Sequence, residues 1–435
     1  MVYLMDELKE FFRKNDIEFI QFQFTTIFGD LKSVEFPSNI WEEMKDGTGV
    51  DGSSLGFLKT EQSDMKIVPD LSTLAVFPWE PRMARFICDV YGNDGNSHPT
   101  DPRSILKKVI KQASDLGYEF KTRPELEWYF LDSDLEPCES GEYMDTLPYD
   151  ELGYLRRSIA SDMQEMGIAV KTIHHEVGNG QQEIEFAALE ALKQADDTQT
   201  AKMIVKADSL FNEIFSTFMP KPFADQAGSG MHVHQYLTKD GKNIFADEEK
   251  GISDTLRYFV GGILKHVDAM TALFNPTTNS YKRLVPGHEA PVYKSWGVAN
   301  RTALIRIPGY EKKARIEFRA ADAASNIYLA SALLLASGLD GIKNMIEPIP
   351  PTTRNVETLS IEERKSMGIV QLPSSLSESL DFLEKSAFVK ETLGQDILDI
   401  FLAVKRIECK EHDEAKSKGE EEEWEWEYET YLDRT

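Results

Sequence analysis

Acidic residues stand inside apolar, strand-like segments at several widely separated places in this chain. The first such segment reads Arg-Pro-Glu-Leu-Glu-Trp-Tyr-Phe at residues 123–130 and carries Glu125 and Glu127. Side chains two positions apart on a strand point to the same face of a sheet, so both carboxylates are expected on one face. That spacing suits two adjacent metal sites, and it constrains how the strands around it can be arranged.

Further acidic residues and a histidine lie in dense local motifs along the chain. Glu176 and Glu183 belong to His-His-Glu-Val-Gly-Asn-Gly-Gln-Gln-Glu-Ile, His232 follows Gly-Ser-Gly-Met, and Glu317 lies in Arg-Ile-Glu-Phe-Arg. Oxygen-rich ligand sets favour Mg²⁺ or Mn²⁺ over zinc. Each carboxylate alone is more simply explained as a surface acid. Together, in ordered motifs flanked by apolar residues, they indicate metal ligands.

A set of arginines follows the acidic motifs. The set consists of Arg283, Arg301, Arg306, Arg315 and Arg319. Guanidinium groups pair with phosphate and carboxylate oxygens, often through two parallel hydrogen bonds. A surface salt bridge is the simpler explanation for any one of them. The whole pattern predicts divalent cations held between the protein and a polyphosphate.

Composition excludes several classes of protein. The chain has 435 residues, enough for two or three domains, and 41% of them are hydrophobic, as in ordinary globular proteins. A formal net charge of −26 argues against a nucleic-acid surface. Three scattered cysteines and an N-terminus without a signal-peptide pattern predict a cytoplasmic location. No apolar run approaches the length of about 18 residues that a membrane span needs.

The first hundred residues predict a small β-rich domain. The patterns indicate a helix at 5–15 and strands at 19–24, 32–36, 74–78 and 84–91. Gly, Asn, Asp and Pro cluster at 93–102, where the domain boundary is expected. Asp101 and Pro102 then form a good helix start, as N-cap and first-turn residue.

The rest of the chain alternates strands with long helices. Strands are expected at 119–131, within 169–186, and at 231–236, 302–308 and 314–320. Helices are expected at 154–166, 191–218, 255–273 and 326–345, with further helices from about residue 375. The charge run Glu420–Glu423 is expected to face solvent.

In this order the motifs resemble the type I, bacterial and archaeal, glutamine synthetase family. The resemblance runs from Phe-Ile-Gln-Phe-Gln-Phe-Thr-Thr-Ile-Phe-Gly at 19–29 to residues 426–432, and its most specific block is Asn-Pro-Thr-Thr-Asn-Ser-Tyr-Lys-Arg-Leu-Val-Pro-Gly-His-Glu, starting at Asn275. It implies an α+β fold, with a β-grasp domain at 1–100 and a catalytic domain at 101–435 built on a curved antiparallel sheet with flanking helices. It also implies a homododecamer of two hexameric rings, with each active site between neighbours.

The resemblance assigns roles to individual residues. It implies one metal ion on Glu127, Glu176 and Glu183, and a second on Glu125, His232 and Glu317. It gives Arg301 to the transferred phosphoryl group and Arg306 to the nucleotide phosphates. The remaining nucleotide-side residues are His234 and Arg315. The implied glutamate-side residues are Gly228, Arg283 and Arg319. His174 and His175 are expected only to shape the metal-bearing strand.

Three further residues resemble the family's ammonium site. Asp51, in Val-Asp-Gly-Ser-Ser, matches an aspartate that a neighbouring subunit lends to bind and deprotonate ammonium. Glu289, in Pro-Gly-His-Glu-Ala-Pro, matches a flap glutamate that takes a proton from ammonium, and Tyr143 matches the tyrosine of the ammonium pocket. Negative charge attracts the ammonium ion and can then accept its proton.

The sequence departs from the family on the substrate side. Ala227 replaces an Asn, Tyr236 a Ser, Lys171 a Glu and His288 a Tyr. A block at 320–328 also differs, through Ala320, Ala323 and Ile327, and the loop after Ser54 is one residue short. Residues 354–358 lack the tyrosine that some members adenylylate, and Lys59 stands at a latch position where feedback-sensitive members have Arg.

The sequence therefore predicts an ATP-dependent glutamate–ammonia ligase that uses Mg²⁺ or Mn²⁺. Its substrates would be glutamate, ammonium and ATP, and a nitrogen-signalling protein is a possible regulatory partner. Two alternatives stay open. One is a γ-glutamyl ligase for another amine, such as methylamine or a polyamine, which Ala227 and His288 allow. The other is a catalytically impaired regulatory relative, which Lys171 and Tyr236 allow.

Overall fold

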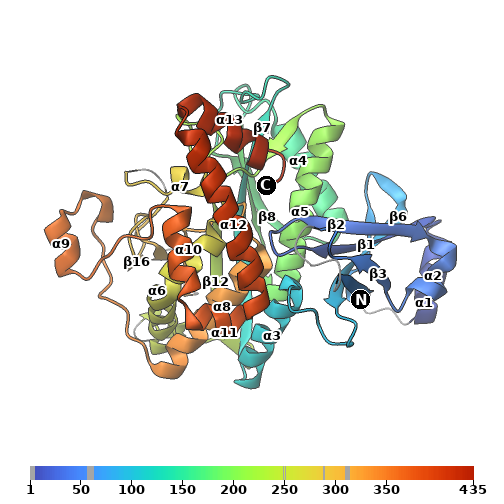
Figure 1. Ribbon diagram of the computed structural model, residues 1–435, viewed down its shortest axis with the longest axis horizontal. Coiled ribbons are helices and arrows are strands. Elements are labelled where there is room, and N and C mark those ends of the chain that lie inside the picture. Colours follow the sequence, from blue (N-terminus) through green and yellow to red (C-terminus); the bar gives the residue numbers. More distant parts are fainter. Residues whose placement is uncertain (1–4, 56–62, 248, 250, 288–289, 309–313) are drawn as a thin grey trace.

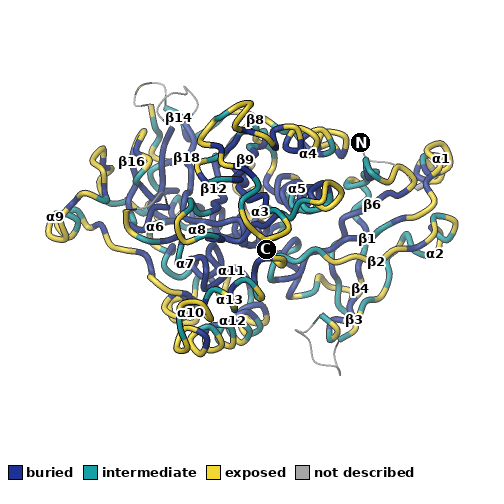
Figure 2. Tube along the Cα trace, turned by 90° about the horizontal axis from the view of Figure 1, so that it is seen from above, coloured by how far each residue is buried: buried dark blue, intermediate teal, exposed yellow. Residues whose placement is uncertain are grey.

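The computed structural model describes residues 5–435 apart from 56–62, 248, 250, 288–289 and 309–313 (Figure 1). Its strands form a six-stranded sheet, a ten-stranded sheet and a separate two-stranded ribbon of β14 (Ala246–Asp247) and β15 (Gly251–Ile252). The six-stranded sheet and the ten-stranded sheet lie side by side along the long axis of the molecule (Figures 1 and 2). No helix in the described ranges is long and apolar enough to cross a membrane.

The smaller sheet belongs to the N-terminal segment, as predicted. Its strands run in the order β2-β1-β6-β4-β3, with β5 paired to β6, and β1 and β6 are parallel. The strands are β1 (Phe19–Thr25), β2 (Leu31–Pro37), β3 (Thr48–Asp51), β4 (Asp64–Pro69), β5 (Ala75–Phe77) and β6 (Glu80–Tyr91). Alternate residues of β1 and β6, among them Phe22 and Phe86, pack with Trp41 of α2 (Trp41–Met44) and with α1 (Met5–Lys14).

The larger sheet carries the motifs of the second segment. Its strands run in the order β16-β17-β18-β12-β7-β9-β8, with β10 and β11 paired to β7 and β13 paired to β12. The strands are β7 (Glu119–Leu131), β8 (Val170–His175), β9 (Gln181–Phe186), β10 (Leu189–Glu190), β11 (Phe215–Thr217), β12 (Met231–Lys239), β13 (Lys242–Asn243), β16 (Trp296–Val298), β17 (Ile305–Ile307) and β18 (Ile316–Phe318). The predicted antiparallel sheet is mixed, because β16 pairs with β17 in parallel.

Helices and the larger sheet enclose the main core. Leu126, Trp128 and Phe130, which alternate with the acidic residues of β7, are fully buried in this core. The helices are α3 (Pro102–Asp115), α4 (Gly153–Glu165), α5 (Ala191–Phe211), α6 (Asp254–Phe274), α7 (Ser280–Arg283), α8 (Ile327–Asn344), α9 (Ile361–Ser366), α10 (Leu376–Glu384), α11 (Ala387–Leu393), α12 (Gln395–Lys416) and α13 (Glu420–Tyr431). The short 3₁₀ turns are η1 (Ser38–Ile40), η3 (Leu71–Thr73) and η4 (Val356–Thr358).

Two predicted features were wrong in detail. The helix expected at 191–218 ends at Phe211, because Asn212 caps it and Glu213 adopts a φ of 59°. Phe215–Thr217 then pairs with β7 as strand β11. The charge run at the start of α13 is also only partly exposed, since Glu423 is buried.

Candidate active site

Cross-strand register places five of the six predicted metal ligands on one face of the larger sheet, and the sixth, Glu176, directly follows β8. Glu125 lies opposite His232 on β12, and Glu127 lies opposite Glu183 on β9. One row further along, His234 of β12 lies opposite Glu317 of β18. Because side chains alternate along a strand, these polar groups share the face opposite the buried Leu126 and Trp128. The alternation inferred from the sequence of β7 therefore extends to its neighbours.

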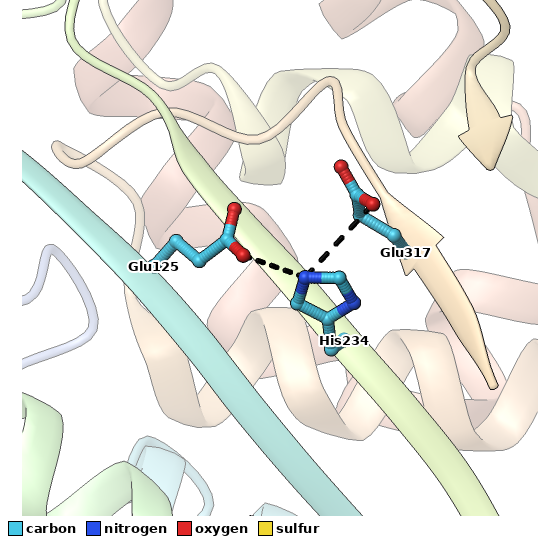
Figure 3. A group of neighbouring side chains, drawn as sticks. All are labelled: Glu125, His234 and Glu317. Atoms are coloured by element: carbon cyan, nitrogen blue, oxygen red, sulfur yellow. Dashed lines mark hydrogen bonds and ion pairs between the residues drawn. The ribbon is translucent and has the colours of Figure 1, made fainter. Parts of the chain in front are cut away.

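The first group of side chains centres on Glu125. Its carboxylate lies 2.6 Å from His234 Nε2, and Glu317 Oε2 lies 3.9 Å from the same nitrogen (Figure 3). His232 Nδ1 lies 3.1 Å from the other carboxylate oxygen of Glu125. Burial disfavours the charged form of Glu125, but the two histidines outweigh it and hold its pKa well below the usual range. Glu125 is therefore an anion held between imidazoles.

Glu317 is neutralised from a second side. Its two carboxylate oxygens each lie 2.5 Å from a guanidinium nitrogen, one of Arg306 and one of Arg319. Burial opposes the charged form, but His234 and Arg319 together lower the pKa of Glu317 to about 2. A predicted metal ligand and two predicted substrate-binding arginines therefore share one network.

The second group contains Glu127, Glu176 and Glu183. His174 Nε2 lies 3.4 Å from Glu183 and its Nδ1 lies 3.9 Å from Glu176. Burial and the charge of Glu183 raise the pKa of Glu176 to about 8, and burial also raises the pKa of Glu127 and Glu183. If all three carboxylates ionised, this group would carry more negative charge than its protein surroundings compensate. A divalent cation fits such a donor set, because it would relieve the repulsion between the carboxylates.

Both groups open into one cavity of about 1390 Å³. The predicted site residues that line it are Glu125, Glu127, Tyr143, Glu176, Glu183, Gly228, His232, Arg283, Arg301, Arg306, Glu317 and Arg319. A volume of this size exceeds what one small substrate needs. The cavity can therefore hold a nucleotide and an amino acid together.

Gly228 is needed where two walls of the cavity meet. A methyl group on Gly228 would lie 2.7 Å from the Arg283 side chain and 2.8 Å from the Pro220 carbonyl oxygen. Arg283 also donates a hydrogen bond of 2.8 Å to the Ala320 carbonyl. The Arg283 side chain thus packs closely against Gly228, where only glycine leaves room for it.

His234 and Arg315 lie deeper than the sequence predicted for nucleotide-binding residues. Both are buried, and Arg315 Nε donates to His234 Nδ1 over 3.1 Å. Neither belongs to the described residues that line the cavity. The two ring nitrogens of His234 both face protein groups, Glu125 on one side and Arg315 on the other.

The residues predicted for the ammonium site do not all line the cavity of this chain. Tyr143 lines the cavity, with its ring against His174 at 5.4 Å. Asp51 is exposed at the end of β3 in the N-terminal domain, where hydrogen bonds from Ser53 and Ser54 hold its pKa below the usual range. It does not line the cavity of its own chain as far as the described residues define it. Glu289, His288 and Lys59 lie outside the described residues.

Other cavity residues escaped the sequence prediction. Those with titratable side chains are His174, Glu185, Lys221, Asp225, Lys282 and Glu357. Glu185 follows Glu183 by two positions on β9, so the alternation that paired Glu125 with Glu127 also contains its signal. His174 was expected only to shape the strand, yet it lines the cavity, whereas its neighbour His175 is buried and contacts Glu139.

The departures from the family pattern fall into two kinds of environment. Ala320, Ala323 and Ile327 are buried in the main core, where apolar side chains pack. Lys171 is exposed and pairs with Glu185 at 2.7 Å. Ala227 lines the cavity, and its carbonyl accepts a 2.6 Å hydrogen bond from Tyr129. Among the departures that the structure describes, Ala227 lines the cavity and Lys171 pairs with a cavity residue, Glu185, whereas Tyr236 is partly buried against the core.

Comparisons with known proteins agree with this geometry. Residues 16–93 match the family described as "Glutamine synthetase, beta-Grasp domain", and residues 99–429 match "Glutamine synthetase, catalytic domain". The glutamine synthetase of Thermotoga maritima is 44% identical over 421 residues, which are 94% of this chain and 96% of the relative. That of Methanosarcina mazei is 42% identical, over 94% of each chain.

Solved structures also match nearly the whole chain. An unliganded structure of GmaS is 29% identical and aligns with a TM-score of 0.86, covering 94% of this chain and 97% of its own. A complex of GmaS with ADP is 30% identical with a TM-score of 0.87, covering 99% of each chain. The fold, the convergent site and these matches establish that the chain belongs to the glutamine synthetase family, whose members are ligases that form carbon–nitrogen bonds.

Proposed function

We propose that this chain is an ATP-dependent glutamate–ammonia ligase that forms glutamine through γ-glutamyl phosphate. The observation that carries the proposal is the convergence of two acidic groups and four arginines on a single cavity. Activation of a carboxylate by ATP needs cations at the phosphates and a clamp that aligns the reacting groups. Relatives named glutamine synthetase, 40–44% identical over most of the chain, support the same reaction.

The metal-binding residues would be the two acidic groups described above. Glu127, Glu176 and Glu183 would hold one Mg²⁺ or Mn²⁺ ion, with His174 beside them. The group around Glu125, His232 and Glu317 would hold the other. Divalent ions supply positive charge to the phosphate oxygens during phosphoryl transfer. The Gly230 N–H, which donates to Glu127 over 2.7 Å, fixes the orientation of that carboxylate beforehand.

The arginines divide the phosphoryl-transfer step between them. Arg283 and Arg319 would bind the glutamate carboxylates, Arg306 the nucleotide phosphates, and Arg301 the transferred group. The γ-carboxylate oxygen attacks the γ-phosphorus of ATP, the bond to the β-phosphate oxygen breaks, and ADP leaves. Arg301 lies exposed at the cavity wall, close enough to Tyr143 to affect its pKa, and can therefore approach a phosphoryl group without breaking a buried contact.

The ammonia step needs a proton acceptor. Ammonium binds beside Tyr143, loses a proton to Asp51 of a neighbouring subunit or to Glu289, and attacks the γ-carbonyl carbon. Inorganic phosphate leaves and a second proton is lost as the amide forms. The exposed, low-pKa carboxylate of Asp51 is an anion at neutral pH, which suits ammonium capture. A dodecamer of two hexameric rings, control by a nitrogen-signalling protein and a cytoplasmic location remain predictions.

One assay distinguishes this function from its alternatives. ADP release is measured with glutamate and ATP in the presence of ammonium, methylamine or a diamine. The highest kcat/KM with ammonium supports the proposal. Faster turnover with a larger amine would instead identify a different γ-glutamyl ligase, for which the small Ala227 side chain leaves space. Nucleotide binding without ADP release from any amine would identify a regulatory relative.

A further inference from the structure

A buried ion cluster joins the C-terminal helices to the wall of the catalytic cavity. It consists of His412 on α12, Glu423 and Glu427 on α13, and Lys282 on α7, and is called the C-terminal ion cluster below. Glu423 and Glu427 are four residues apart, so both project from one face of α13. Glu427 has no exposed surface, and Glu423 retains 7%. The partners of two such buried carboxylates are therefore important for the fold around them.

Glu427 binds partners on both sides. One of its oxygens lies 3.0 Å from Lys282 Nζ and accepts a 2.8 Å hydrogen bond from Asn279 Nδ2, and the other lies 3.2 Å from His412 Nε2. Glu423 lies 3.2 Å from the same lysine and 3.1 Å from the same histidine. The ammonium of Lys282 thus pairs with both carboxylates and supplies the positive charge that a metal ion would otherwise have to supply. The cluster is therefore an ion network and not a metal site.

Asn279 extends this network to a second segment of chain. It is fully buried, its Oδ1 accepts from the Lys221 N–H over 2.7 Å, and its Nδ2 also donates to the Lys221 carbonyl over 2.9 Å. Its side-chain amide therefore links Glu427 to the segment that runs from Lys221 to Gly228. One carboxylate of α13 thus holds two separate parts of the cavity wall.

Both parts reach the predicted glutamate site. Lys221 and Lys282 line the cavity, and Arg283 follows Lys282 directly. The Arg283 side chain packs against Gly228, where a methyl group would come within 2.7 Å of it. The close contact between Arg283 and Gly228 consequently depends on the relative position of the two segments that Glu427 and Asn279 join.

We infer that Glu427 is a positioning residue for glutamate binding, acting through Asn279 and Lys282 on Arg283. The inference rests on the proposed function, in which Arg283 binds a glutamate carboxylate. Loss of the Glu427 charge leaves the Lys282 ammonium partly unpaired and loosens the wall. The effect falls on glutamate and spares ATP, because Arg301 and Arg306 do not belong to these two segments.

The test uses the full-length enzyme with Glu427→Gln, which keeps the side-chain shape and removes the charge. We expect the glutamate KM to rise about tenfold or more, with kcat and the ATP KM within about threefold of wild type, because an interaction lost equally from ground and transition states changes KM alone. Asn279→Ser, which interrupts the same chain of contacts at another point, should give the same split. Glu425→Gln, on the exposed face of α13, is the matched control and should change nothing.

The outcomes separate the possible roles of the cluster. A wild-type glutamate KM in Glu427→Gln and Asn279→Ser would overturn the inference. A parallel change of kcat and both KM values, with a lower melting temperature, would also overturn it and show that the cluster only stabilises the fold. If the wild type fails to use ammonium, the proposed function fails; glutamate binding by calorimetry with a non-hydrolysable ATP analogue then tests the positioning role by itself.

Discussion

Arg301 and Arg306 differ in their surroundings, although both line the catalytic cavity. Arg306 is buried and forms an ion pair with Glu317, whereas Arg301 is exposed and follows the buried Asn300. A side chain held by a protein carboxylate is already oriented before a nucleotide arrives. An exposed arginine can instead respond to charge that develops during the reaction. The two residues should therefore affect different kinetic constants.

Arg301→Ala should lower kcat by roughly 10³–10⁵, the range found for arginines at a transferring phosphoryl group. Arg306→Ala should mainly raise the ATP KM, by roughly tenfold to a hundredfold, the equivalent of one hydrogen bond to a charged group. Steady-state kinetics with ATP varied at saturating glutamate and ammonium measures both effects. The reverse pattern would exchange the roles of the two arginines.

The carboxylates allow a second residue-scale prediction. Glu127→Ala and Glu317→Ala each remove a ligand from a different predicted metal site, so turnover should fall by more than about a hundredfold, the scale at which even changes to the partners of metal ligands act. Mg²⁺ titrations of activity, with circular dichroism to verify the fold, provide the measurement. Near-normal activity of either variant at saturating Mg²⁺ would refute the assignment of that residue.

At the scale of elements, the sequence was most informative where a pattern had a single structural explanation. β7 was expected at 119–131 and spans Glu119–Leu131, because apolar and acidic residues alternate along it. α3 begins at Pro102, with Asp101 accepting from the Arg103 and Ser104 N–H groups as a predicted N-cap. Such local signals are complete within a few residues, so no distant contact was needed to interpret them.

The predictions that were wrong or incomplete concern features that depend on contacts with distant residues. The end of α5 depends on the positive φ of Glu213 and on the pairing of β11 with β7, and neither is visible in the helical periodicity that runs on to residue 218. Glu423 was assigned to solvent because it belongs to a charge run, and its burial requires Lys282 and His412 from other elements. His174 was undervalued for the same reason, since its role depends on Glu183 of the neighbouring strand.

One arginine connects elements of both domains. Arg103 of α3, with 3% of its side chain exposed, pairs with Asp70 and Asp89 of the N-terminal domain and with Asp196 of α5. Tyr328 of α8 adds a 2.8 Å hydrogen bond to Asp196. Asp89 would keep its 2.5 Å ion pair with Lys107 after removal of the arginine, but the buried carboxylate of Asp196 would lose its ion-pair partner. Such uncompensated buried charge is strongly destabilising.

Arg103→Met should therefore lower the free energy of unfolding by about 3–5 kcal/mol. Arg82→Met is the matched control, because Arg82 pairs with Glu18 at the surface, with side chains 62% and 51% exposed, and exposed pairs contribute about 0–1 kcal/mol. Urea unfolding of both variants at one fixed protein concentration measures the difference. Equal stability of the two variants would mean that the ions around Arg103 do not hold the domains together.

At the scale of the whole molecule, the position of Asp51 requires explanation. The predicted metal ligands lie on the larger sheet or, for Glu176, directly after its strand β8, while Asp51 lies at the end of β3 at the opposite side of the molecule from β16 (Figure 2). It is exposed, and over the described residues it is not part of its own chain's cavity. If Asp51 serves the ammonia step, it must do so from a neighbouring subunit. A head-to-tail ring provides such an interface for every subunit.

Co-assembly of two defective chains tests this arrangement. Asp51→Ala keeps the predicted metal ligands and removes the carboxylate that is expected to bind ammonium. Glu127→Ala removes a predicted metal ligand and keeps Asp51. In rings with random, equal mixing, half of the sites have an intact metal group, and half of those face an intact Asp51. Mixed rings should therefore recover about a quarter of wild-type activity, as head-to-tail contacts require.

The two chains would carry different affinity tags, so that co-expressed rings containing both can be isolated and assayed for glutamine formation. If Asp51 acts within its own chain, every site in such a ring carries one defect, and activity cannot exceed that of the two separate variants.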